Sequence, residues 1–110
     1  DEFIKNNIKI ENPLSNTVIS PPLTIKGQAK GNWYNEGQFR VILKTLDGNK
    51  IKGINVKAQD NWMSEDFVPF QARMSFQAPE AEKGYLVFKK ANPSDMPEKA
   101  KTVIIPVNFP

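Results

Sequence analysis

DNWMSEDFVPF, at residues 60–70, places one tryptophan and two phenylalanines beside three acids in a stretch that joins two alternating, strand-like segments. An ordinary connection between strands needs only polar turn residues with glycine or proline. The large apolar side chains beside Asp60, Glu65 and Asp66 therefore indicate a segment that either packs back onto the sheets or faces a partner.

Apolar and polar residues alternate on both sides of this stretch, as they do along half-buried strands. The alternation is clear in four segments and shorter or interrupted in three more. The predicted strands are residues 7–10, 23–30, 39–44, 50–58, 70–77, 84–90 and 102–109. The 9 prolines are spread along the chain and argue against long helices.

Three local signals refine this pattern. LDGN at residues 46–49 carries the Asp-Gly pair typical of a tight hairpin, which here joins two of the predicted strands. The apolar phase of the following strand slips across Gly53, where we expect a bulge. Pro106 has no amide hydrogen to donate, so we expect the last strand at a sheet edge, open to pairing with a second copy.

Seven strands with short connections and one apolar face each favour two packed sheets. The sequence predicts an all-β fold, an immunoglobulin-like β-sandwich of about seven antiparallel strands in two sheets. If successive strands run in opposite directions, the connections at 31–37, 59–69 and 91–101 share one end. Acids outnumber lysines in these connections, so we expect an acidic, aromatic end, with lysines over the sheets and the opposite loops.

Length and composition narrow the function. At 110 residues the chain is long enough for one core, so we expect a single domain over residues 1–110. It starts at Asp1 and shows no signal-peptide or membrane-spanning pattern, so we expect a fragment of a longer secreted or lipid-anchored protein. It contains no histidine and no cysteine. The usual general base, nucleophile systems and most zinc sites are thereby excluded, and we expect neither an enzyme nor a cofactor or metal.

Several stretches together resemble one protein family. They are NTVISPPLTIKGQA at 16–29, NWYNEGQF at 32–39, DNWMSEDFVPF at 60–70, GYLVF at 84–88 and NPS at 92–94. This set resembles the immunoglobulin-like domain of bacterial spore germination proteins. The resemblance implies a noncatalytic, extracytoplasmic module of the bacterial cell envelope, with no established ligand and no active site to transfer.

Four aromatic residues, Trp33, Tyr34, Trp62 and Phe67, fall in the connections assigned to the shared end. Large rigid aromatics supply much of the binding energy at interfaces, so these four are candidates for an exposed binding platform. The alternative is that they plug the open end of the sandwich, because an exposed cluster of this size lowers solubility. A mixed arrangement would bury Trp62 and Phe67 and leave Tyr34 at the rim.

Acids are frequent in the same connections, namely Glu36, Asp60, Glu65, Asp66 and Asp95. Together with Asn92 they offer the oxygen ligands that Ca²⁺ prefers, although their spacing matches no calcium loop. The alternative is that these carboxylates accept hydrogen bonds from loop amides or cap turns. We expect Glu36, Asp60 and Trp62 to organise the loops, with Glu36 and Glu65 as buried acceptors.

NPSDMPE at residues 92–98 is a proline-stiffened excursion in which Ser94 and Asp95 are candidates to contact a partner. The predicted binding surface therefore comprises seven residues of the shared end. They are Trp33, Tyr34, Glu65, Asp66, Phe67, Ser94 and Asp95.

The sequence thus predicts a noncatalytic binding module whose partner is an envelope protein or a wall polymer. A purely structural spacer is the alternative, and a carboxylate-dependent hydrolase of wall glycans is disfavoured because it needs a cleft. The lysines are dispersed and the only arginines are Arg40 and Arg73, so we expect no nucleic-acid partner. Anionic wall polymers stay open as weak, salt-sensitive partners. We expect a monomer.

Overall fold

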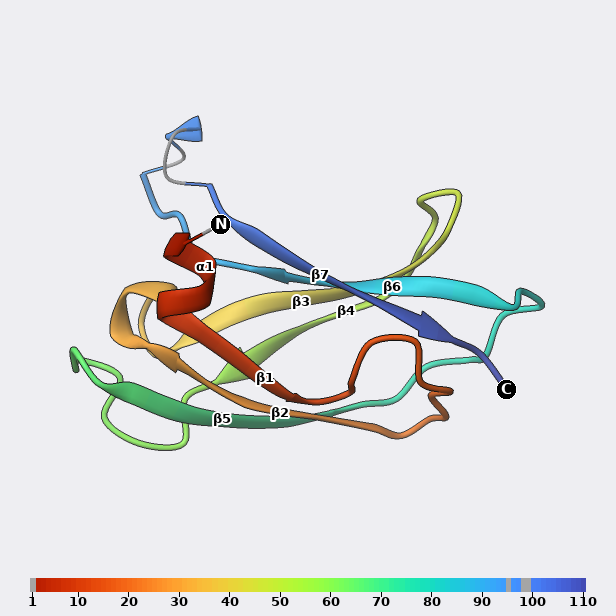
Figure 1. The fold of residues 1–110 in the computed structure, drawn as a ribbon, viewed down its shortest axis with the longest axis horizontal. Helices are drawn as coiled ribbons and strands as arrows, with labels where there is room; N and C mark the ends of the chain where they lie inside the picture. The colour runs from red at the N-terminus through yellow and green to blue at the C-terminus, as the bar shows by residue number, and fades with distance from the viewer. Residues whose placement is uncertain (1, 95, 98–99) are drawn as a thin grey trace.

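The computed structural model describes residues 2–94, 96–97 and 100–110 and folds them into two antiparallel sheets that face each other (Figure 1). One sheet has the strand order β1-β2-β5 and the other β4-β3-β6-β7. The elements are α1 (Glu2–Asn7), β1 (Ile8–Asn12), β2 (Leu23–Lys30), η1 (Gly31–Trp33), β3 (Gln38–Thr45), β4 (Lys50–Lys57), β5 (Phe67–Met74), β6 (Lys83–Lys89) and β7 (Thr102–Asn108). The predicted immunoglobulin-like β-sandwich of seven antiparallel strands is confirmed.

The two helical elements were not predicted, because α1 and the 3-10 turn η1 are too short to show a helical period. Strand β5 also begins earlier than the alternation from Phe70 suggests. Val68 already points into the core, and Phe67 pairs with Lys30 of β2. The end of the stretch at residues 60–70 is therefore strand, and only its first part is a connection.

The core lies between the two sheets, and the inward phase of each strand supplies it. Ile25 of β2, Val41 of β3 and Leu86 of β6 are fully buried, as the alternation predicts. The rings of Phe39 and Phe70 come from opposite sheets and meet edge to face, with centroids 5.0 Å apart. Burial of this apolar surface is the main force that stabilises the sandwich.

The expected bulge at Gly53 is wrong in its position. Gly53 pairs regularly with Ile42, and the register shifts farther back along β4, where Ile51 is the extra residue. Gly53 instead makes room for a side chain of the neighbouring strand. A Cβ at this position would lie 2.6 Å from Nη2 of Arg40, so the guanidinium occupies space that a larger residue at position 53 would take.

The Asp-Gly hairpin and the edge position of Pro106 are confirmed. Gly48 has a φ of 90°, and its amide donates to the Thr45 carbonyl at 2.9 Å. Strand β7 is the outermost strand of its sheet, as the proline predicts. Its end is not open, however, because residues 16–19 run along it, with the Asn16 amide donating to the Pro106 carbonyl at 2.7 Å.

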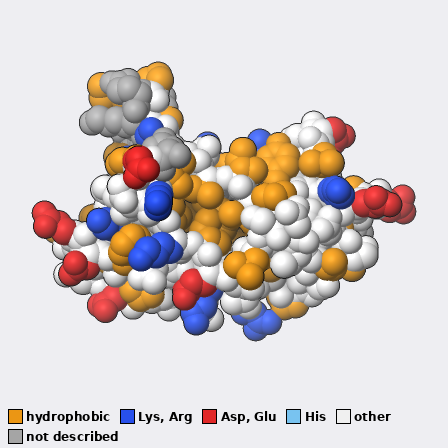
Figure 2. All heavy atoms as spheres, in the orientation of Figure 1, with side chains coloured by type: hydrophobic (Ala, Val, Ile, Leu, Met, Phe, Trp, Pro, Cys, Tyr) orange, Lys and Arg blue, Asp and Glu red, His pale blue; other side chains and the backbone are white. Residues whose placement is uncertain are grey.

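The three connections assigned to one end do meet there. The Gly31 amide donates to the Ser64 carbonyl at 3.1 Å, and the Ala91 amide donates to the Trp33 carbonyl at 2.9 Å. The expected charge division between the two ends is wrong, since Figure 2 shows acidic side chains at both ends of the long axis. The reason is that the opposite connections carry acids of their own, including Asp47, Glu80 and Glu82.

Candidate functional site

Trp33 and Tyr34 close the end of the sandwich from inside. Their exposed fractions are 0% and 5%, so the expectation that they offer exposed contacts to a partner is wrong. The Tyr34 hydroxyl donates to the Val68 carbonyl at 2.8 Å, and its ring meets Phe39 edge to face. Burial raises the pKa of Tyr34 to about 12. Trp33 and Tyr34 therefore plug the open end of the sandwich and are not part of an exposed binding platform.

Trp62 and Phe67 are half-buried, each for a different reason. The Trp62 ring packs on the earlier connection at residues 31–37, with its Cδ1 atom 3.0 Å from where a Cβ of Gly37 would lie. The Phe67 ring is covered by two cations, with the Lys9 and Lys30 amino groups 4.3 and 5.4 Å from its centroid. Phe67 therefore offers less apolar surface than expected.

Glu36 and Glu65 are exposed, so the expectation that they are buried acceptors is wrong. Glu36 matters through its backbone, which has a φ of 51° and is followed by Gly37 at 79°. Two such residues make a tight reverse turn, closed by the Gln38 amide donating to the Asn35 carbonyl at 3.1 Å, with the Asn35 amide donating back to the Gln38 carbonyl at 2.9 Å. A carboxylate is not what this turn needs.

Short polar side chains organise the connection at residues 59–66. The Asn61 amide donates to the Asp60 carboxylate at 2.7 Å, and the Met63 amide donates to the Asn61 side chain at 3.0 Å. The hydroxyl of Ser64 accepts from the Asp66 amide at 3.0 Å. Asn61 and Ser64 escaped prediction, although bonds from a side chain to the amide two residues on are typical of both residue types.

A glycine lets this connection dock against the rest of the end. A Cβ on Gly31 would lie 2.3 Å from the Trp62 carbonyl oxygen and 2.6 Å from that of Ser64. The backbone of residues 62–64 therefore passes directly over Gly31, and no larger residue fits.

Asn92, Ser94 and Met96 of the excursion are joined by hydrogen bonds within it. The Ser94 hydroxyl donates to the Asn92 side chain at 3.2 Å, and Asn92 donates to the Met96 carbonyl at 2.9 Å. Ser94 is exposed, while Asp95 lies outside the described residues. The acids considered for calcium do not converge within the described part of the chain, where no group of three or more potential metal-ligating side chains occurs.

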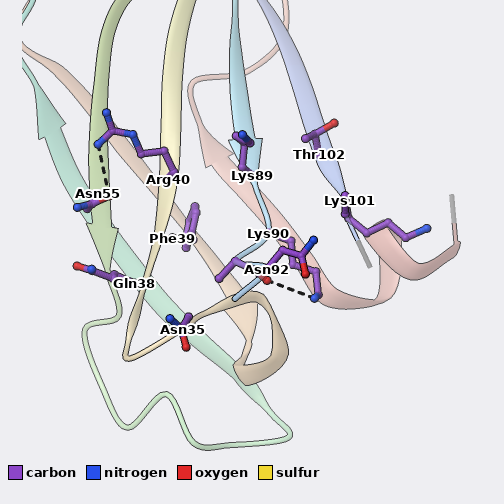
Figure 3. A pocket seen from close by; sticks show the side chains of 12 residues that line it. Asn35, Gln38, Phe39, Arg40, Asn55, Lys89, Lys90, Asn92, Lys101 and Thr102 are labelled. Atoms are coloured by element: carbon purple, nitrogen blue, oxygen red, sulfur yellow. Dashed lines mark hydrogen bonds between the residues drawn. The ribbon is translucent and has the colours of Figure 1, made fainter. Parts of the chain in front are cut away.

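A hollow of about 400 Å³ lies at the same end, against the outer face of the four-stranded sheet (Figure 3). One residue from each strand forms a cross-strand row along it: Asn55 of β4, Arg40 of β3, Lys89 of β6 and Thr102 of β7. Arg40 is paired with Asn55 on one side and with Lys89 on the other, and Lys89 is paired with Thr102. The Arg40 guanidinium donates to the Asn55 side chain at 3.4 Å.

The lining of this hollow is cationic and rich in amides. Among the described residues it contains no carboxylate, and its remaining polar residues are Asn35, Gln38, Lys90, Asn92 and Lys101. The amino groups of Lys90 and Lys101 also lie 6.0 and 5.7 Å from the ring of Phe3 on α1. Such a surface can hold an anion through charge-assisted hydrogen bonds.

Sequence reasoning missed the hollow because the lysines looked dispersed along the chain. Alternation does put Arg40 and Lys89 on the outward phase of their strands. Only the strand order, which sets β3 beside β6, reveals that the two residues are directly paired.

Comparisons with known proteins place the chain beside one family. The sequence model of the immunoglobulin-like domain of bacterial spore germination matches residues 7–97. No curated protein and no solved structure gives a significant match. None of the helices in the described ranges has the length and apolar character that a membrane span requires.

Proposed function

The chain belongs to the family of the immunoglobulin-like domain of bacterial spore germination, and we propose that it serves a cell-envelope protein as a noncatalytic binding module. Its place is extracytoplasmic, in a secreted or lipid-anchored protein. Its task is to hold a component of the envelope by contact, without chemical change.

One observation carries this proposal. The cross-strand row of Asn55, Arg40, Lys89 and Thr102 presents hydrogen-bonding groups from all four strands of one sheet along a single hollow. Strand pairing fixes the spacing of the backbone that carries these groups before any ligand arrives. Binding then has to order the side chains alone and not the backbone, which is what a recognition surface needs.

A carboxylate-dependent hydrolase of wall glycans has less support from the residues of this end than a binding module has. Glu65 and Asp66 are both exposed and belong to the connection at 59–66, whereas the hollow has no carboxylate among its described lining residues. A general acid and base must flank the same substrate bond, usually in a cleft that tunes their pKa values. These two residues remain candidates for polar contacts at the rim of the proposed binding end.

A purely structural spacer is the second candidate, and the shape of the molecule favours it. The molecule measures 40 × 28 × 22 Å, and helix α1 and the end of strand β7 lie toward opposite ends of the long axis (Figure 1). A domain with this arrangement adds length between whatever precedes it and whatever follows it.

Cosedimentation of the purified chain with washed bacterial envelopes separates the two candidates. A binding module pellets with the envelopes in a saturable way, while a spacer stays in the supernatant at the level of an unrelated sandwich domain. Replacing Glu65 and Asp66 by Gln and Asn in one variant tests the acidic connection. Unchanged binding by that variant would remove the connection from the proposed surface.

A further inference from the structure

The geometry points to a ligand class for the hollow: we propose that it binds the oxyanion groups of a hydroxyl-rich anionic polymer, carried as phosphate or as carboxylate. This inference rests on the proposed function and adds to it the chemistry of the partner. Arg40 and Lys89 are the anion contacts, and the amides and hydroxyl around them bind the hydroxyl groups of the polymer.

The first argument is the placement of two like charges. Arg40 and Lys89 are directly paired across β3 and β6. Side chains in such pairs start about 4.5–5.5 Å apart, and like charges there destabilise a sheet. No carboxylate among the described lining residues offsets them. A polymer that lies along the row would bring oxyanions to both cations, so the sheet keeps an arrangement that favours binding over stability.

The second argument is the way the arginine is held. Its Nη1 atom bonds Asn55 at 3.4 Å, and its Nη2 atom lies where Gly53 has no side chain. The guanidinium is thus laid against β4, on the side away from Lys89. Guanidinium carries five N–H donors, and the long bond to Asn55 uses one of them. The remaining donors suit the paired oxygens of phosphate or carboxylate.

The third argument concerns the rest of the lining. Gln38 and Asn55 have side chains with both donors and acceptors, and Thr102 adds a hydroxyl. Sugar and polyol hydroxyls need both kinds of partner. Phe39 is the aromatic residue in the described lining, and only 3% of it is exposed, so bases find no platform on which to stack. The hollow therefore favours a glycopolymer or polyol chain over a nucleic acid.

The test is titration calorimetry with two anionic probes, a poly(glycerol phosphate) oligomer and an oligogalacturonate, and with neutral dextran as the uncharged control. We expect at least one anionic probe to bind and dextran not to bind. The probe that binds more tightly shows whether the oxyanion groups that the hollow prefers are phosphates or carboxylates. Raising the salt concentration weakens binding, because exposed charges are screened. Failure of both probes to bind overturns the proposal, and so does equally tight binding of single-stranded DNA.

Matched variants locate the contacts. We expect the double variant Arg40→Gln/Lys89→Gln to lose about tenfold or more in affinity, since two charge-assisted bonds are removed. The control Arg73→Gln/Lys26→Gln removes the same charges from exposed positions on the three-stranded sheet and should keep the affinity. Equal losses in both variants overturn the assignment to the hollow.

Melting temperatures test whether a variant loses affinity only because it is less stable. Lys89→Gln removes the like-charge pair, so at low salt it should leave the melting temperature unchanged or raise it while weakening binding. A lower melting temperature would contradict the first argument.

The envelope assay distinguishes failure of the anion site from failure of the proposed binding module. Binding to envelopes that survives both the double variant and high salt defeats the anion site and leaves the binding module standing, whereas no binding to envelopes defeats the module itself.

Discussion

At the scale of single residues, Trp33 is a side chain whose burial carries a cost in hydrogen bonding. It is fully buried, yet its indole nitrogen has no hydrogen-bond partner among the described residues. A buried donor without a partner costs free energy that the apolar part of the ring must offset. Trp33 therefore stabilises the end of the sandwich by its volume and not by its polar atom.

Truncations of Trp33 separate these two contributions. Trp33→Ala should lower the free energy of unfolding by about 3–5 kcal/mol, since it leaves a large cavity. Trp33→Phe keeps most of the volume and removes the unpaired donor, so we expect a loss of about 1–2 kcal/mol. Urea denaturation measures both. Equal losses would mean that the indole nitrogen has a partner.

Tyr34 makes stability depend on pH in the alkaline range. Burial raises its pKa to about 12 in the folded state, while a tyrosine in the unfolded chain titrates near 10. The folded state thus holds the proton more tightly, so its stabilising effect is complete below pH 10 and disappears as the pH rises toward 12. We expect wild-type stability to fall more steeply between pH 10 and 12 than that of Tyr34→Phe.

The other tyrosine is the control for this measurement. Tyr85 is half-buried on β6, and Tyr85→Phe removes the same hydroxyl from a second position, so comparing the two variants assigns a change in slope to Tyr34. Lysines also titrate in this range, but they are common to all three proteins and cancel in the comparison. A Tyr34→Phe profile parallel to wild type would show that the Tyr34 hydroxyl is not shielded from water.

At the scale of elements, the tight turn at residues 35–38 is formed against the preference of its second residue. Glu36 adopts a left-handed conformation, with a φ of 51°. That region is costly for most side chains, while Asn and Gly tolerate it. The turn is used because its twist matches that of hairpin strands.

Glu36→Asn should therefore raise the stability by about 0.5–1 kcal/mol. The control Glu80→Asn also removes a charge from an exposed acid and should change little. Thermal melting compares the two. A drop in melting temperature for Glu36→Asn alone would restore the carboxylate as an organiser of the loop.

The strands and the irregularities within them also show how much of the structure could be predicted from the sequence. The strands were predictable because each has one buried and one exposed face. Apolar and polar residues therefore alternate along the sequence of each strand. The bulge was misplaced because Gly53 leaves room for Arg40 of the neighbouring strand, and such a reason lies outside the local sequence. The hollow was missed for a related reason, since the closeness of Arg40 and Lys89 depends on which strands are neighbours.

At the scale of the whole molecule, the acids of the shared end do not form a cation site in the described part of the chain. Glu36, Glu65 and Asp66 are exposed, and each belongs to a loop fixed by backbone bonds. We therefore expect the same melting temperature in millimolar calcium and in a chelator. A rise with calcium that Asp60→Asn or Asp95→Asn removes would bring the calcium hypothesis back.

The two edge strands of the four-stranded sheet, β4 and β7, are the basis for expecting a monomer. The outer edge of β4 carries Lys50, Lys52 and Lys57, and repulsion between such lysines opposes pairing with a second copy. Residues 16–19 occupy the end of β7. Sedimentation velocity should give one species of monomer mass up to millimolar concentration. A dimer that forms at high salt, where lysines are screened, would identify β4 as the pairing edge.

The pairing of residues 16–19 with β7 also bears on how the molecule would carry a mechanical load. Val18 and Asn108 bridge in parallel, and backbone bonds join Asn108 to Thr17 and to Ile19. When the two chain ends are pulled apart, parallel segments slide past each other, so these bonds are strained together and not one after another. A tether between two anchored objects needs that property, and stretching single molecules should show one abrupt rupture in place of gradual unzipping.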